Sequence, residues 1–421
     1  MSALLVIRHL ASVVPARAWV FAGVATAGIV ALTAAGVRHS SVPDEVMVAV
    51  APAIGAPGGP ASSRDGLHGR VVEMENRLRQ NPGDVSASIS LADALLRQAR
   101  AGNDNRPAGR AAAVLENALK EAPGSYDALR LLGAVDLSLH RFRDAFDVGR
   151  RARDMRPGDA WNYGVMGDAL LELGDYDQAF ENFDRMMQLR PGPGAYARVA
   201  YARELTGDLA GAASAMEMAY TASSSRDPEA QAWYSTQLGE LELKRGRTAE
   251  ASRQFRRAQF TFPEYPLAVV GAGKVKLAEG DAAGALALYL DQFGRTPTLD
   301  LACRIGDLHA AAGRAGQAEH YYQLAEDVAG PAAAQTEAAL ALFLADHDRK
   351  LDLAIDIAQR VAATRHDIAT EHALAWAYYK AGRRSEAAST MTRALRTGWR
   401  DPDLLAHAAV IDAASKSALR R

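Results

Sequence analysis

The sequence has little cysteine and few aromatic residues. Cys303 is the only cysteine among 421 residues, which excludes an internal disulfide framework. Aromatic residues make up only 7% of the chain, although hydrophobic residues make up 49%. Such a composition favours helices packed closely through alanine and aliphatic side chains over an aromatic-rich β-structure. The chain is also too long for one typical compact core, which indicates several domains or a repeat array.

The sequence also lacks a charge imbalance and the motifs of common enzymes. Its 48 basic and 50 acidic residues give a formal net charge of −2, so no global field would attract nucleic acid. It contains no Walker loop, no G-x-S-x-G and no H-E-x-x-H motif, and its ten histidines show no metal-ligand spacing. We therefore predict no catalytic, cofactor-binding or metal-binding residues. The chain is expected to be neither an enzyme nor a nucleic-acid-binding protein.

One long uncharged segment lies near the amino terminus. Residues 18–37 contain no charge, and a helix of this length spans about 30 Å, the hydrocarbon thickness of a bilayer. The apolar regions of signal peptides are usually shorter, about 7–15 residues. We therefore predict a transmembrane anchor or uncleaved signal at 18–37. A cleaved signal and a buried soluble helix are the alternatives.

The residues around this segment predict its orientation and the linker that follows it. Arg8 and Arg17 precede the segment, so the positive-inside rule places residues 1–17 in the cytoplasm and the rest of this single-pass membrane protein outside it, on the periplasmic or cell-surface side. Residues 38–66 are rich in proline and glycine, which predicts a flexible linker. Small residues four apart also suggest a possible homodimer through the anchor; they are Gly23, Ala27, Ala31 and Ala35.

The rest of the chain repeats with a period near 34 residues. Two groups of three prolines are spaced by 34 residues, at 123, 157 and 191 and at 263, 297 and 331. Glycines followed by a polar or charged residue recur in a similar phase, at 174, 207, 246, 280, 313 and 382. Two independent markers with one period indicate an array of repeats.

The unit at 160–192 shows the pattern inside one repeat. Its second half carries Ala179, Phe183 and Met186 at the spacing of an apolar helix face. Gly174 suits the tight turn before this helix, and Pro191 ends the unit because proline cannot continue a helix. Each unit therefore reads as helix, turn and helix.

These markers resemble the consensus of the tetratricopeptide repeat (TPR) family over roughly residues 85–401. The best copy carries matching residues at Tyr163, Met166, Gly167, Leu170, Gly174, Ala179, Phe183, Met186 and Pro191. Other copies depart from the consensus at the turn glycine, which is replaced at His140 and within residues 346–348. The resemblance implies an all-α fold, a right-handed superhelical solenoid of about nine TPR-like helix-turn-helix units, here joined to one N-terminal transmembrane helix. The repeat domain would cover 67–401, with a C-terminal capping helix and tail at 402–421.

The resemblance also implies where a partner would bind. In this family, residues of each unit's first helix line a concave groove. Mapped onto this sequence, those positions predict an acidic and aromatic groove for a protein or peptide partner, formed by Trp161, Asp168, Tyr201, Trp233, Glu240, Lys274, Asp307 and Trp376. The alternative is a solvated helix face with incidental aromatics.

The function predicted from the sequence is protein binding. The chain would be a membrane-anchored scaffold or assembly factor that binds partner peptides or proteins in the TPR groove, with residues 18–37 in the membrane. A regulatory or targeting subunit of an enzyme complex, with catalysis on a partner, is the alternative.

Overall fold

The computed structural model describes residues 64–336 and 338–418. Within these residues the chain forms twenty helices and no strand. The first ten are α2 (Arg64–Gln80), α3 (Val85–Gly102), α4 (Arg106–Glu121), α5 (Tyr126–Ser138), α6 (Phe142–Met155), α7 (Ala160–Glu172), α8 (Tyr176–Leu189), α9 (Pro193–Leu205), α10 (Leu209–Ala222) and α11 (Pro228–Lys244). The remaining ten are α12 (Thr248–Thr261), α13 (Pro266–Ala278), α14 (Ala282–Arg295), α15 (Leu299–Ala311), α16 (Ala315–Thr336), α17 (Ala338–Asp346), α18 (Leu351–Ala362), α19 (Ile368–Lys380), α20 (Arg384–Ala394) and α21 (Pro402–Ala418).

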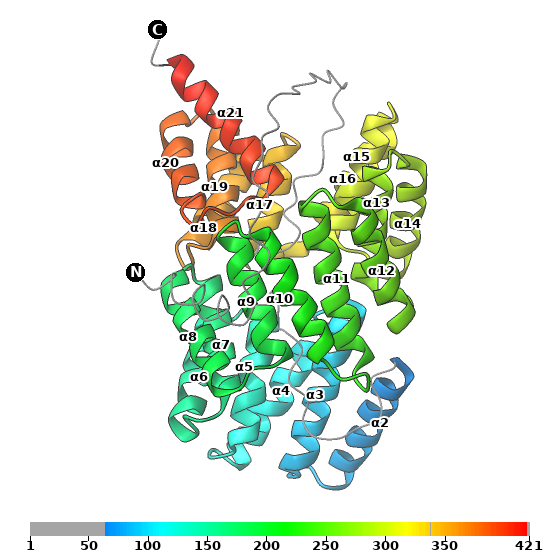
Figure 1. The fold of residues 1–421 in the computed structure, drawn as a ribbon, viewed down its shortest axis with the longest axis vertical. Coiled ribbons are helices and arrows are strands. Elements are labelled where there is room, and N and C mark those ends of the chain that lie inside the picture. Colours follow the sequence, from blue (N-terminus) through cyan, green and yellow to red (C-terminus); the bar gives the residue numbers. More distant parts are fainter. Residues whose placement is uncertain (1–63, 337, 419–421) are drawn as a thin grey trace, which may run out of the picture.

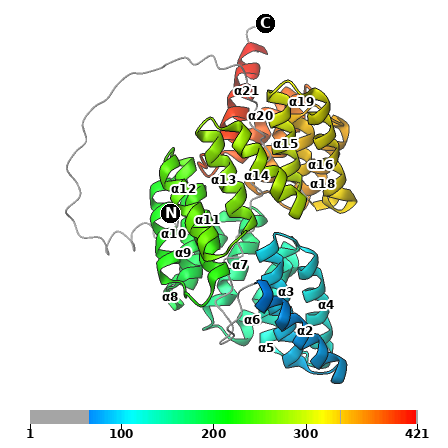
Figure 2. The ribbon, with the colours of Figure 1, turned by 90° about the vertical axis from the view of Figure 1, so that its right-hand side faces the viewer.

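Consecutive helices form hairpins that stack into an elongated solenoid (Figure 1). Nine helix pairs run from α3–α4 to α19–α20, with α2 before the first and α21 after the last. Helices α2 to α6 lie at one end of the long axis, and α15, α16 and α19 to α21 lie at the other, with α9 to α11 between them, as both views show (Figures 1 and 2). The first and the last helices of the described chain therefore lie at opposite ends of the molecule.

The turns within the pairs use left-handed backbone conformations. All six glycines that mark the turns in the sequence have positive φ, between 73° and 86°. Where the repeat lacks its glycine, His140 takes the same conformation at φ 58° and Asp348 does so at φ 53°. Glycine reaches this region without the steric cost that other residues bear. The turn geometry is therefore kept even where the sequence departs from the consensus.

Small residues let the helices approach closely. A Cβ atom added at Gly167 would lie 2.5 Å from the Phe183 ring, because α7 and α8 are in contact there. Phe255 of α12 lies in the same way against Gly239 of α11 and Gly271 of α13, and its ring is 1% exposed. Glycine and alanine thus make room for the few large rings, which explains a helical core with so few aromatic residues.

Helix α16 is interrupted at the place where the sequence predicts the end of a repeat. Gly330 has φ 65° and ψ 178°, which no helix contains, so two helical stretches meet there. Gly330 directly precedes Pro331, one of the periodic prolines. At the amino-terminal end, α2 begins at Arg64, inside the stretch predicted to be linker.

The predicted fold class needs a correction, because it included a transmembrane helix. None of the helices in the described part of the chain is long and apolar enough to cross a membrane. Even the 18-residue helix α3 carries Asp93, Arg97 and Arg100 along its length, and charged side chains are costly in hydrocarbon. The predicted anchor at 18–37 lies outside the described residues. The structure supports the all-α solenoid but not the single-pass membrane localisation.

Candidate partner-binding site

The amino-terminal helices fold back onto the middle of the solenoid. Arg100 of α3 donates two hydrogen bonds to the carboxylate of Glu229 on α11, at 3.3 and 2.9 Å. Glu229 is only 1% exposed, and its pair with Arg100 joins residues 129 positions apart. Arg97 reaches Asp227, the N-cap residue of α11, at 3.3 Å. Two ion pairs therefore hold α3 against the start of α11.

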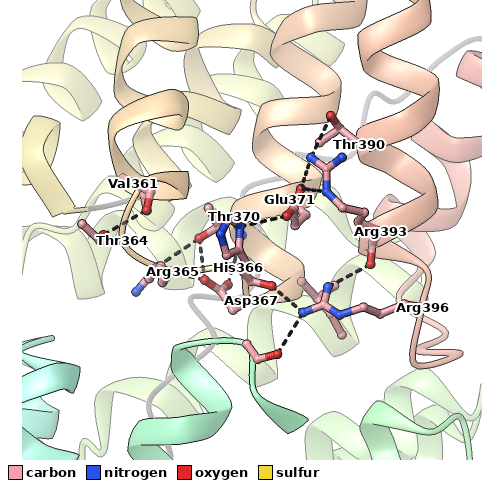
Figure 3. A network of polar contacts seen from close by, with 12 residues as sticks. Val361, Thr364, Arg365, His366, Asp367, Thr370, Glu371, Thr390, Arg393 and Arg396 are labelled. Atoms are coloured by element: carbon pink, nitrogen blue, oxygen red, sulfur yellow. Dashed lines mark hydrogen bonds and ion pairs between the residues drawn. The ribbon is translucent and has the colours of Figure 1, made fainter.

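The carboxy-terminal helices fold back onto α8 and the turn before it. The Tyr176 hydroxyl accepts a hydrogen bond of 2.9 Å from the backbone N–H of Ile368, and the N–H of His366 donates to the Leu173 carbonyl at 3.2 Å. Arg396, after α20, donates to the carbonyls of Gly174 and His366 (Figure 3). The last helix pairs are thus fastened to the third pair.

The turn between α18 and α19, which contacts the turn before α8, is held by a polar network of its own. Glu371 is 1% exposed and accepts two hydrogen bonds from Arg393, at 3.0 and 2.8 Å, while His366 Nδ1 lies 3.2 Å from its other oxygen (Figure 3). Asp367 caps α19 by accepting from the N–H of Thr370 at 3.0 Å. Because the two carboxylates at its centre, Glu371 and Asp367, are buried and satisfied, this network fixes the local conformation of the start of α19.

One pocket lies where these distant segments meet, and we call it the central pocket. It has a volume of about 130 Å³. Its walls come from the first helices of three consecutive pairs, α9, α11 and α13, from the turn between α14 and α15, and from Trp399 after α20. Asn103, the C-cap of α3, completes the rim. The central pocket therefore depends on the folding back of both ends of the chain.

Four of the eight predicted groove residues line the central pocket. They are Tyr201, Trp233, Glu240 and Lys274. Tyr201 is on α9, Trp233 and Glu240 are on α11, and Lys274 is on α13. The family's register of inward-facing positions thus brings residues of three consecutive units into one place.

The other four predicted residues do not line this pocket. Trp161 is 2% exposed and belongs to the core formed with α3 to α6. Its indole N–H donates to the Arg130 carbonyl at 3.2 Å, and the Arg130 guanidinium lies 4.6 Å from the ring centroid. Trp161 is therefore covered by the preceding unit and, unlike Trp233, does not line the central pocket.

Buried partners also occupy the remaining three residues. Asp168 accepts hydrogen bonds from Arg198, one of them at 2.9 Å, and burial raises its pKa to about 6 against the opposing charge of Arg198. The Asp307 carboxylate accepts from the Tyr322 hydroxyl at 2.7 Å. Trp376 stacks on His407 with the ring centroids 3.7 Å apart. Each of these side chains links helices within the solenoid.

The charges around the central pocket are paired. Lys244 bonds Glu204 at 2.8 Å, and Lys274 bonds Glu240 at 3.0 Å. Asp300 accepts from Arg304 Nε at 2.8 Å. Each carboxylate of the lining therefore has a cationic partner, although Arg304 itself does not line the pocket.

Two polar atoms of the lining residues are buried without a hydrogen-bond partner. They are the Nε1 atom of Trp399 and the Oδ1 atom of Asp300. Buried polar groups normally find a partner, because leaving one unmade costs about 1–3 kcal/mol. Both atoms are covered by neighbouring protein atoms, so a group in the central pocket could bond them only after a local rearrangement.

The sequence did not single out Trp399, Asp300 or Asn103. The repeat register predicts which face of a first helix points inward, but Asn103 and Trp399 lie outside the helices, and Asp300 lies in the first turn of α15. Their place in the pocket results from contacts between units far apart in the chain.

Other features of the described residues do not form a site. Among residues 64–336 and 338–418 no group of three or more His, Cys, Asp or Glu side chains could hold a metal ion. The arginine-rich helix α6 and its flanks carry ion pairs such as Arg150–Asp147 and Arg153–Asp154. This agrees with a salt-bridged outer face. Cys303 is fully buried, and burial raises the pKa of its thiol.

The repeats match a known family. A family model described as "Tetratricopeptide repeat" matches residues 104–160, 165–234 and 236–295. The protein is thus a helical repeat protein of the solenoid class. These matches cover less than half of the chain, and over them the repeats are similar to tetratricopeptide repeats, as the sequence markers predicted. No curated protein sequence matches the chain.

Solved structures show the same fold at low sequence identity. Human IFIT1 dimers crystallised with m7Gppp-AAAA and with PPP-AAAA match with TM-scores of 0.51 and 0.50, at 13% and 14% identity. The first match covers 78% of this chain and 77% of IFIT1, and the second covers 78% of each. The Cut9–Hcn1 hetero-tetramer of the APC/C matches with a TM-score of 0.46 at 15% identity, over 83% of this chain and 63% of that one. At 13% and 14% identity, the likeness to IFIT1 concerns the fold alone.

Proposed function

We propose that this protein is a scaffold that binds a partner protein through the central pocket. The tetratricopeptide fold is typically a non-catalytic platform for protein interactions. The observation that carries the proposal is the convergence of Tyr201, Trp233, Glu240 and Lys274 on one pocket lined by three consecutive first helices. Aromatic side chains in a pocket between repeats are the usual anchors of a protein interface.

A nucleic-acid ligand, such as the RNA present in the IFIT1 structures, is less well supported. RNA binding depends on cationic side chains that neutralise phosphates. Here both lysines of the central pocket are in ion pairs with glutamates. The formal net charge of the chain is −2, which supplies no compensating attraction.

Site-specific photocrosslinking tests this proposal. Gln237 lies on the wall of the central pocket and is half-buried, whereas Phe260 on α12 is 89% exposed and outside the pocket. A photoreactive phenylalanine analogue is placed at one position or the other of the full chain in its source cells. We expect crosslinks to a discrete partner protein from position 237 and none to that protein from position 260. Crosslinks from position 260 alone would contradict the proposal.

A further inference from the structure

The outer face of the last helix, α21, is apolar and open to solvent. Leu405 and Val410 are 44% and 42% exposed, and Ala406, Ala409 and Ala413 are exposed with them. Residues three and four positions apart lie on one face of a helix, so these five form a continuous stripe, which we call the α21 stripe. A helix on the surface of a globular protein normally turns a polar face to water. The α21 stripe therefore has the character of a contact surface.

Contacts on the opposite side of α21 fix which face points outward. Leu404 and Ile411 are at most 2% exposed and belong to the core that α19 and α20 share. The Nδ1 atom of His407 lies 2.9 Å from Nε2 of His372 on α19, and the His407 ring stacks on Trp376. Turning α21 about its axis to hide the stripe would break these contacts. The exposure of the stripe is therefore a property of the folded chain.

The position of α21 in the solenoid indicates what kind of surface the stripe is. The helix follows the last helix pair, at one end of the long axis (Figures 1 and 2). Repeat arrays cover the apolar face of each unit with the next unit, and a terminal helix normally has a polar outer face. Between Pro402 and Ala413, however, the only exposed charged residue is Asp412. The stripe thus resembles the contact between units, and another helix is the element that fits it.

The charges of α21 favour an antiparallel second copy of the same helix. Asp403 lies in its first turn and Lys416 near its end. Two parallel copies would bring each of these residues level with its own counterpart, and like charges repel. In two antiparallel copies related by a two-fold axis between Ala409 and Val410, Asp403 of one helix is level with Lys416 of the other. The same pairing occurs twice across the axis.

The sizes of the residues along the stripe agree with the same register. Leu405 is level with Ala414 of the second copy, and Val410 is level with Ala409. Each larger side chain then faces an alanine, so the ridges of one helix can enter the grooves of the other. A contact with two-fold symmetry requires a surface that is complementary to itself. One register satisfies this requirement for both charge and size.

We propose that the α21 stripe binds the α21 stripe of a second copy of this chain, in an antiparallel helix pair that makes the protein a dimer. The contact is formed by α21 alone and does not involve the central pocket, so this inference does not depend on the proposed function. A dimer would hold two copies of the scaffold in a fixed relation. Such an arrangement strengthens binding to a partner that carries two sites.

Disulfide crosslinking of the full chain tests the contact directly. Cys303 is the only cysteine and is fully buried, so an introduced cysteine is the one accessible thiol. Val410→Cys lies beside the two-fold axis, where two copies come within the Cα separation of about 4.4–6.8 Å that a disulfide spans. Val72→Cys on α2 is its control, because Val72 is also 42% exposed. We expect copper phenanthroline to convert Val410→Cys to a covalent dimer and to leave Val72→Cys monomeric.

A charge introduced into the stripe tests the contact without a crosslink. Sedimentation velocity of the full chain over a dilution series measures dimer dissociation. Because the contact is symmetric, Val410→Glu changes it at two places, and we expect dimerisation to weaken by about a hundredfold or more. Val72→Glu should leave it unchanged. Both positions are exposed in one chain, so the melting of each variant under monomeric conditions should match that of the unmodified protein.

Three results would overturn the inference. The first is a chain that stays monomeric at every concentration, with no covalent dimer from Val410→Cys. The second is a dimer that Val410→Glu does not weaken, which would place self-association elsewhere, with the small residues of segment 18–37 the next region to test. The third is crosslinking of Val410→Cys in cells to a different protein alone. Photocrosslinking from position 237 addresses another surface, so its failure would leave the dimer standing.

Discussion

The hydroxyl of Tyr176 on α8 accepts a hydrogen bond of 2.9 Å from the backbone N–H of Ile368, 192 residues further along the chain. The first N–H groups of a helix have no acceptor within that helix, so Tyr176 satisfies a group at the start of α19 that would otherwise need water. The contact joins the third helix pair to the last. It makes this solenoid a chain closed on itself, in which distant units share walls of one pocket.

The docking of the turn before α19 makes Gly174 more sensitive to substitution than a turn glycine with no such neighbour, such as Gly246. Gly174 has φ 86°, and a Cβ atom there would lie 2.5 Å from the backbone of His366. Gly246 has φ 73°, with nothing within 4 Å of the same position. We expect Gly246→Ala to cost about 1 kcal/mol from backbone strain alone and Gly174→Ala to cost about 2 kcal/mol more from the clash. Urea denaturation measures both, and equal losses would show that α19 does not dock at Gly174.

The amino-terminal contact depends on a buried ion pair. Arg100→Ala leaves the carboxylate of Glu229 buried and unpaired, so we expect a loss of about 3–5 kcal/mol in the free energy of unfolding. The double variant Arg100→Met with Glu229→Met should recover most of it, because it leaves no buried charge. Arg253→Ala breaks the exposed pair with Glu250 on α12 and should change little. Thermal melts compare the stability of these three variants. An Arg100→Ala variant as stable as the unmodified protein would mean that α3 and α11 are not in contact.

Trp161 and Trp233 differ in their surroundings, although both are first-helix tryptophans. It occupies the same repeat position as Trp233, and both are 2% exposed, but only Trp233 lines the central pocket. We expect Trp161→Ala to cost about 3–5 kcal/mol, as large-to-small changes in a core do. The measurement is the urea unfolding curve. Full stability combined with lost partner capture would instead make Trp161 part of the interface.

The contrast between these two tryptophans shows how far the sequence could lead. The period of prolines and glycines is a local signal, because each turn needs its own backbone conformation. This period predicted where the helix pairs lie and which positions of each first helix face inward. Whether an inward position is covered depends on how neighbouring units pack. Trp161 lies under Arg130 of the previous unit, whereas Trp399 reaches the pocket through closure between units. Both are contacts between different units, so the sequence pattern of a single repeat does not predict them.

A buried carboxylate near the closure predicts a pH dependence. Burial, and then the charge of Asp367, raise the pKa of Glu172 to about 8 despite the opposing effect of Arg365, from an ordinary value of 4.5. Between these values the folded state holds a proton that the unfolded state has released. Stability should therefore fall as the pH rises from about 4.5 to about 8. Glu172→Gln should flatten this dependence in melts taken across the range, and an unchanged slope in that variant would contradict the assignment.

Hydrogen exchange at the backbone amide of Ile368 tests the closed solenoid most directly. This N–H begins α19 and has no acceptor within the helix, so any protection reports its bond to Tyr176. NMR or electron-transfer mass spectrometry resolves the single amide in the full chain. The closed structure predicts an amide that exchanges far more slowly than its intrinsic rate, and that loses this protection in Tyr176→Phe while amides in the middle of α19 keep theirs. Exchange of Ile368 at the intrinsic rate in the unmodified protein would show that α19 is not docked on α8 and that the solenoid is not closed there.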